Sequence, residues 1–125
     1  MSGATRKDRG GGARDRYRRL GIPRRFKMHG HEITVRILPL SRWPHTKGAV
    51  GMWDPALNRI DLRGDQPDTA LQQTLCHEVV HSILSAMNHK LNNDEVFVDN
   101  FGSLLAQALA SFTHRRPRAR SKSNG

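Results

Sequence analysis

Residues 68–88, DTALQQTLCHEVVHSILSAMN, decide how this chain folds. Their apolar residues recur mainly at four-residue spacing from Leu71 to Met87, which is the period of one helix face. The Asp68-Thr69 pair follows Pro67 and supplies the polar chemistry that starts a helix. The stretch therefore predicts an amphipathic helix that runs to about residue 88 and buries one face.

Short strands are predicted before this helix. Residues 32–38, EITVRIL, alternate between apolar and polar side chains, as a strand with one buried face does. Residues 49–53 and 58–63 are two further candidates, and the Asp54-Pro55 turn between them predicts a hairpin. We expect residues 58–63 to form a solvent-facing or edge strand.

A second helix is predicted after residue 93. Asn92 or Asn93 can cap it, and Asp94 and Glu95 suit its first turn electrostatically. Its expected buried face comprises Phe97, Phe101, Leu104, Leu105, Ala108 and Phe112. The predicted fold class is α+β, with a short, mostly antiparallel sheet of about three strands packed on the two helices.

Charge divides the chain into three parts. The formal net charge is +10, from 21 Lys and Arg against 11 Asp and Glu. Residues 1–27 hold 10 basic and 2 acidic residues, and residues 115–125 hold 5 basic and none acidic. Residues 28–114 hold 6 basic and 9 acidic residues, a net of −3. We therefore expect a folded domain over 28–114, flanked by disordered basic tails over 1–27 and 115–125.

The chemistry of the chain is concentrated in His77-Glu78-Val79-Val80-His81. Histidines at positions i and i+4 of a helix lie one turn apart on one face, so both imidazoles can bind a single zinc ion. Glu78 lies beside that face, where it can act as a general base toward a zinc-activated water. This segment predicts a catalytic zinc site.

A third protein ligand is expected from the second helix. Glu95 and Asp99 are again four residues apart and share a face, with Gly102 one turn further along, leaving room for a close approach. The favoured arrangement has Glu95 on the metal and Asp99 accepting a histidine N–H from outside the ligand shell. An ideal antiparallel hairpin would instead bring residue 99 level with His81, which keeps Asp99 as an alternative ligand.

The HExxH motif followed by ExxxD resembles the gluzincin class of zinc peptidases. The compact size and the short gap between the helices are similar to the ImmA/IrrE-type metallopeptidases and to small HExxH proteins of phages and prophages. The resemblance implies a zincin-like fold, zinc bound by His77, His81 and Glu95, and Glu78 as general base. It also implies that the edge strand, expected at residues 58–63, pairs with an extended peptide. A displayed Arg59 or Arg63 would favour acidic substrates.

Two kinds of function follow from these features. The first is a zinc-dependent peptidase acting on a protein or peptide. The alternative is a non-enzymatic or latent zinc-binding module that acts through its basic tails on nucleic acid, by nonspecific contact, or on an acidic partner. No segment has the length and apolarity of a membrane span, and the single Cys76 fits a reducing compartment, so we expect a cytoplasmic protein.

Overall fold

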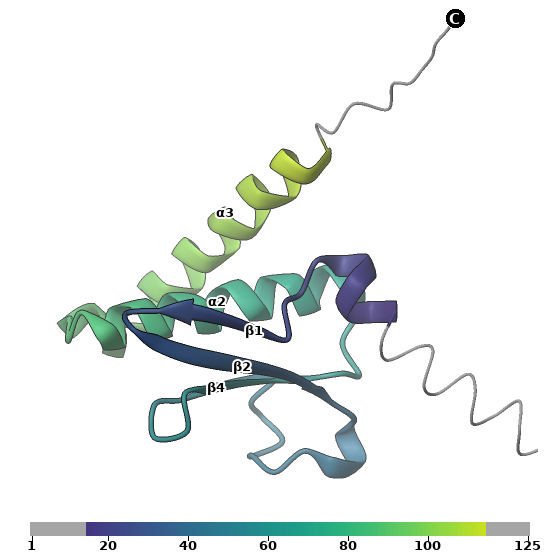
Figure 1. The fold of residues 1–125 in the computed structure, drawn as a ribbon, viewed down its shortest axis with the longest axis horizontal. Coiled ribbons are helices and arrows are strands. Elements are labelled where there is room, and N and C mark those ends of the chain that lie inside the picture. Colours follow the sequence, from purple (N-terminus) through teal and green to yellow (C-terminus); the bar gives the residue numbers. More distant parts are fainter. Residues whose placement is uncertain (1–14, 115–125) are drawn as a thin grey trace, which may run out of the picture.

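A computed structural model describes the chain from residue 15 to residue 114 (Figure 1). A four-stranded sheet and two long helices dominate it, which confirms the α+β class. The strands are β1 (Arg25–Met28), β2 (His31–Leu38), β3 (Gly51–Asp54) and β4 (Arg59–Arg63). The long helices are α2 (Asp68–Ala86) and α3 (Glu95–His114), and the 3-10 helices are η1 (Leu40–Arg42) and η2 (Lys90–Asn93).

The sheet is mixed, in the order β1-β2-β4-β3. β1 pairs with β2 and β3 pairs with β4 in antiparallel fashion, as the predicted hairpin requires for the second pair. The central pair, β2 and β4, is parallel, with Val35 opposite Ile60. The expectation of about three, mostly antiparallel strands therefore missed one strand and the parallel centre.

The missed strand also corrects the expected start of the domain. β1 alternates basic and apolar side chains, and Phe26 and Met28 pack against the core while Arg25 and Lys27 face solvent. Residues 15–20 form a helical segment, and Ile22 is only 3% exposed. The prediction of a flexible tail over 1–27 is therefore wrong from residue 15 onward. Residues 1–14 and the predicted tail 115–125 lie outside the described part.

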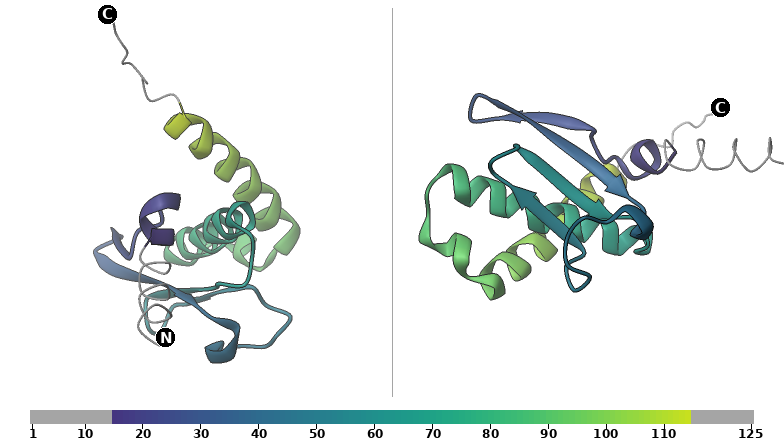
Figure 2. Two further views of the ribbon diagram at one scale, coloured as in Figure 1. Left: turned by 90° about the vertical axis from the view of Figure 1, so that its right-hand side faces the viewer. Right: turned by 90° about the horizontal axis from the view of Figure 1, so that it is seen from below.

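α2 lies across one face of the sheet, and α3 packs on the far side of α2 (Figure 2, left). The core between α2 and the sheet is formed by Ile22, Ile33, Val35, Ile60, Leu62 and Leu71. A second cluster joins α2 to α3 through Val80, Leu84 and Val98. α2 therefore packs against the sheet through the first cluster and against α3 through the second.

The buried face of α3 agrees with the expected one only in part, since Phe97 and Leu105 pack against the second cluster. Val98 is fully buried and Gly102 faces the backbone of α2, whereas Phe101, Leu104 and Phe112 are 49%, 65% and 68% exposed. Because Gly102 permits a close approach, the side of α3 that carries Val98 and Gly102 faces α2. Phe101, Leu104 and Phe112 therefore lie beside the contact and not within it. α3 then extends beyond α2 toward the C-terminus (Figure 1).

Candidate metal centre

α2 positions His77 and His81 one turn apart, as the helix period predicts. Their rings meet edge to face with centroids 5.0 Å apart, and both side chains are partly buried. Both rings turn toward the start of α3. The helix therefore presents two imidazoles side by side on the flank where the second helix begins.

Glu95, the first residue of α3, completes the group. Its Oε1 lies 3.2 Å from His77 Nε2, and its Oε2 lies 2.9 Å from His81 Nε2. One donor atom from each of the three residues lies within 4.8 Å of the others, and the group can hold a metal ion. The residues expected as ligands are thus brought together by α2 and by the turn that precedes α3.

Asp99 is placed on the other side of His77. Its Oδ1 lies 3.5 Å from His77 Nδ1, the ring nitrogen that faces away from Glu95, and its side chain is 79% exposed. It does not belong to the three-residue group. From this position Asp99 would orient the His77 ring if that ring bound a metal. The connection through η2 is not an ideal hairpin, which is why residue 95, and not residue 99, reaches both histidines.

The corresponding partner of His81 was not foreseen. Asn92 Oδ1 lies 2.7 Å from His81 Nδ1. Because an amide oxygen accepts but does not donate, this contact places the ring proton on Nδ1 and leaves Nε2 free to bind a metal. Asn92 is not the helix cap that the sequence suggests: Asp94 takes that role, since its Oδ1 accepts the Phe97 N–H. The only sequence feature that could have indicated this contact is the presence of an asparagine in the short connection between α2 and α3.

Glu78 is buried between the two histidines and β3, with only 7% of its surface exposed. Burial raises the pKa of this carboxyl, and the neighbouring His77 and His81 offset only part of the effect. The Trp53 backbone also donates a hydrogen bond to it. A Cβ at Gly51 would lie 3.0 Å from Glu78 Oε2 and 2.5 Å from Thr74, so a glycine is needed for β3 to come this close.

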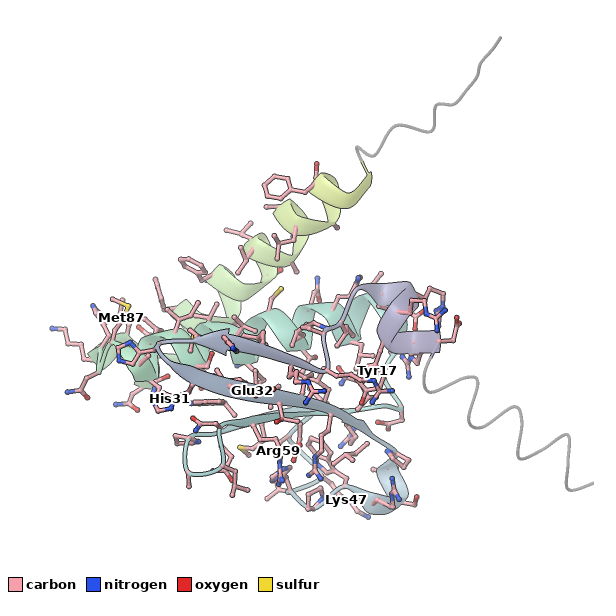
Figure 3. The ribbon with its side chains drawn as sticks, in the orientation of Figure 1. Tyr17, His31, Glu32, Lys47, Arg59 and Met87 are labelled. Atoms are coloured by element: carbon pink, nitrogen blue, oxygen red, sulfur yellow. The ribbon has the colours of Figure 1, made fainter. Side chains whose placement is uncertain are left out.

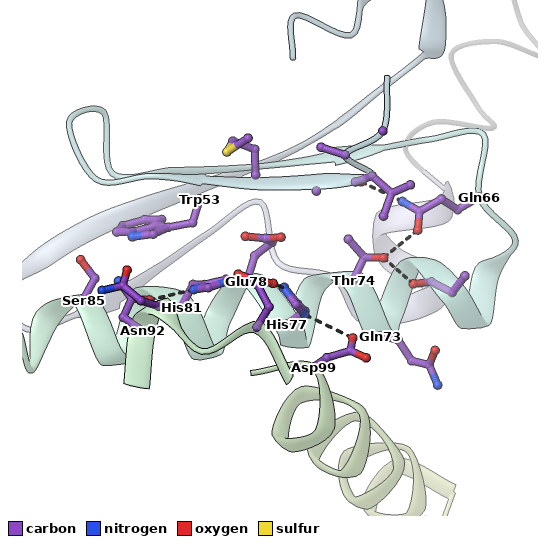
Figure 4. A pocket seen from close by; sticks show the side chains of 18 of the residues that line it. Trp53, Gln66, Gln73, Thr74, His77, Glu78, His81, Ser85, Asn92 and Asp99 are labelled. Atoms are coloured by element: carbon purple, nitrogen blue, oxygen red, sulfur yellow. Dashed lines mark hydrogen bonds and ion pairs between the residues drawn. The ribbon is translucent and has the colours of Figure 1, made fainter. Parts of the chain in front are cut away.

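These groups line a cleft of about 870 Å³ between β3, α2 and the start of α3 (Figure 4). Trp53 lies across the cleft from His81, and Asp99 approaches His77 from α3. The charged and titratable lining residues are His77, Glu78, His81, Glu95 and Asp99, with no Lys or Arg. The indole Nε1 of Trp53 has no hydrogen-bond partner among the described residues.

The edge strand that borders the cleft is β3, whereas the sequence predicted an edge strand at residues 58–63. β4 lies in the interior of the sheet, between β2 and β3, so residues 58–63 are not an edge strand. Arg59 and Arg63 pair with Asp61 and Asp65 and do not line the cleft. The expectation that these arginines select acidic substrates is therefore wrong. The pattern of β4 could not reveal its central position, because that position depends on pairing with the distant β2.

Comparison with known proteins gives no further assignment, since the chain matches no family model, no curated protein and no solved structure. Within residues 15–114, no helix has the length and apolarity that crossing a membrane requires. The resemblance to HExxH zinc peptidases therefore stays a prediction from the residues of α2 and α3.

Proposed function

We propose that this protein is a zinc-dependent peptidase. The observation that carries the proposal is the convergence of His77 Nε2, His81 Nε2 and the Glu95 carboxylate beside a buried glutamate in one open cleft. A structural zinc site normally closes its coordination shell with four protein ligands, whereas a catalytic site keeps one position open. Three donor residues at the wall of a cleft match the second pattern.

The donor set also fits zinc. Two imidazole nitrogens and one carboxylate oxygen are a ligand combination that zinc accepts in catalytic sites. Asn92 and Asp99 each contact the Nδ1 atom of a different histidine, which holds the ring and directs Nε2 toward Glu95. Zinc, when bound, supplies a Lewis acid that polarises a peptide carbonyl and lowers the pKa of water.

Glu78 performs the proton transfer in this proposal. Its carboxylate lies beside the histidines without belonging to the three-residue donor group, so its oxygens are free to take a proton. The same carboxyl then gives that proton to the amine that leaves. The burial of Glu78 under β3 keeps bulk water from exchanging the proton before it is used.

β3 supplies a surface for the substrate backbone. It is one of the two edge strands of the described sheet, and it lines the cleft with Gly51, Met52 and Trp53. An extended peptide can add to such an edge by main-chain hydrogen bonds, with alternate side chains directed into the cleft.

Metal analysis of the purified full chain tests the first half of the proposal. We expect about one zinc per chain, and loss of that zinc in His77→Ala. A wild-type zinc content well below one, or unchanged zinc in the variant, refutes a zinc site at these residues.

Glu78→Gln tests the second half, with zinc-loaded wild type and a quenched-fluorescence peptide library as the assay. Gln has the same size, and its amide oxygen can still accept the Trp53 hydrogen bond, so zinc is retained. We expect cleavage by the wild type and a rate about 10²–10⁴-fold lower in the variant. A zinc-loaded wild type that cleaves no library member favours the non-enzymatic alternative.

A further inference from the structure

A second cavity, here called the arginine pocket, lies toward the β1–β2 side of the sheet, away from the edge formed by β3. Its volume is about 440 Å³. It is lined by Tyr17, Arg24, Arg25, Thr34, Val35, Arg36, Ile37, Leu38 and Arg42. Four of these nine residues are arginines and none is acidic, and no lining residue is shared with the metal cleft. Tyr17 lies at the end of the sheet opposite His31 (Figure 3).

Arg24 is held in place by an aromatic ring. Its guanidinium carbon lies 4.0 Å from the centroid of the Tyr17 ring. The Tyr17 hydroxyl in turn accepts the backbone N–H of Ile37 at 2.8 Å, which anchors the ring on β2. Stacking leaves the N–H groups at the edge of the guanidinium available for an oxygen-rich ligand. Arg24 is therefore positioned with no carboxylate ion pair to any residue between 15 and 114.

Arg36 is held by a buried carboxylate. Its Nε and Nη2 donate to Asp61 at 2.9 and 3.1 Å, and Asp61 is 2% exposed. His45 and Arg59 contact the same carboxylate at 2.9 and 3.4 Å. The single negative charge of Asp61 is thus shared among several cationic or titratable groups. Arg36 keeps its remaining N–H groups and a partly exposed side chain.

The other two arginines add positive charge at the rim. Arg42 ends η1, and its side chain has no ion pair or hydrogen bond within the part of the chain that the structure describes. Arg25 has one ion pair, to Glu32 at 3.5 Å, in which both side chains are largely exposed. Exposed pairs of this kind contribute little. The pocket therefore carries several cationic groups that are not neutralised locally.

We propose that the arginine pocket binds the phosphates of a nucleic-acid strand. Guanidinium groups match phosphate oxygens in geometry and charge, and the supports under Arg24 and Arg36 keep two of them oriented before the ligand arrives. Four arginines line one pocket, which is more cationic charge than a single small anion needs and therefore favours an extended polyanion. The sequence predicted nucleic-acid contact through flexible tails over 1–27 and 115–125. Arg24 and Arg25 fall within the first of these ranges, but the structure places them in the folded part, beside Arg36 and Arg42. This proposal is independent of whether the candidate metal centre binds zinc.

The test compares two full-length double variants of equal charge. Arg24→Gln/Arg42→Gln removes two cations that have no carboxylate partner in the described part of the chain, and Lys47→Gln/Lys90→Gln removes two exposed cations that do not line the pocket. The probe is a fluorescent single-stranded oligonucleotide about 20 nucleotides long, titrated at several salt concentrations. We expect the arginine variant to bind about tenfold more weakly, with a salt slope lower by about 1.4. The lysine variant should lie close to wild type.

Three results overturn the proposal. Equal losses in the two variants show that only the overall charge attracts the strand. Unchanged binding in the arginine variant, with a thermal midpoint equal to that of wild type, shows that the pocket makes no contact. Displacement of the oligonucleotide by millimolar inorganic phosphate at constant ionic strength, in wild type but not in the arginine variant, assigns the pocket to a free phosphate compound instead of a strand.

Discussion

Substitution of Gly102 by alanine tests the packing that brings Glu95 to the histidines. A Cβ at this position would lie 2.9 Å from His77 Cα and 3.0 Å from His77 N. Ordinary contact begins at 3.4 Å, so α2 and α3 must separate by about 0.5 Å, because both atoms belong to the backbone of α2. Metal–ligand distances tolerate only about 0.2 Å. The substitution therefore strains the metal centre as well as the helix pair.

The expected sign of the effect is opposite to that of helix propensity. Replacing glycine by alanine inside a helix alone stabilises by about 1 kcal/mol, whereas overpacking costs about 1–3 kcal/mol. We expect Gly102→Ala to lower the free energy of unfolding by about 1 kcal/mol and to weaken zinc binding about tenfold. Urea unfolding of the metal-free protein and competition with a chromophoric chelator measure the two quantities separately.

Gly48→Ala is the matched control, because a Cβ there meets nothing within 4 Å. It should change the free energy of unfolding by less than about 0.5 kcal/mol and leave zinc affinity unaltered. If Gly102→Ala is instead more stable than wild type and binds zinc equally well, the close approach of the two helices does not position Glu95, and the reasoning fails.

Three further substitutions probe groups that orient other side chains. Asn92→Ala should weaken zinc binding about 10–100-fold through loss of the 2.7 Å contact with His81, whereas Asp99→Ala should have a smaller effect because its contact is 3.5 Å and exposed; equal effects on zinc affinity contradict this ranking. Burial by itself would raise the pKa of Asp61, but hydrogen bonds from Arg36 and His45 and the charges of Arg36 and Arg59 outweigh it and hold the pKa below its usual value. The ionised carboxylate therefore stabilises the fold above the unfolded pKa of about 3.9, and this contribution is lost as the pH falls through the lower folded pKa. Asp61→Asn should cost about 1.5–3 kcal/mol in urea unfolding at neutral pH, and the difference should shrink in strongly acidic solution; a difference independent of pH would contradict it.

The features of the fold that sequence patterns predicted are local ones. α2, the β3–β4 hairpin and the pairing of His77 with His81 follow from helical spacing, a Pro-containing turn and an i, i+4 relation. β1 was missed because its Arg25 and Lys27 resemble the preceding basic sequence, although Phe26 and Met28 alternate with them. Because residues 1–27 were judged by their net charge, the alternation of basic and apolar residues in β1, which is typical of a strand, was overlooked.

The features that were not predicted depend on residues far apart in the sequence. Asp61 alternates with Ile60 and Leu62, which favours a solvent-facing side chain, yet it is buried by partners from β2 and from the loop after η1. The parallel pairing of β2 with β4 likewise crosses over the β3 segment and has no short-range signature. Asn92 and Asp99 could be assigned to separate histidines only when the angle between α2 and α3 was known.

The three donor residues of the candidate metal centre and the residues that enclose Glu78 come from different parts of the chain. Binding of a metal and the environment of Glu78 therefore depend on different contacts. All three donor residues come from one continuous segment, from His77 to Glu95, so the ion depends on contacts between neighbouring helices. The enclosure of Glu78 is built by Gly51 and Trp53, which belong to a different hairpin. Under the proposed function, damage confined to that hairpin would leave a chain that still binds zinc but no longer encloses Glu78.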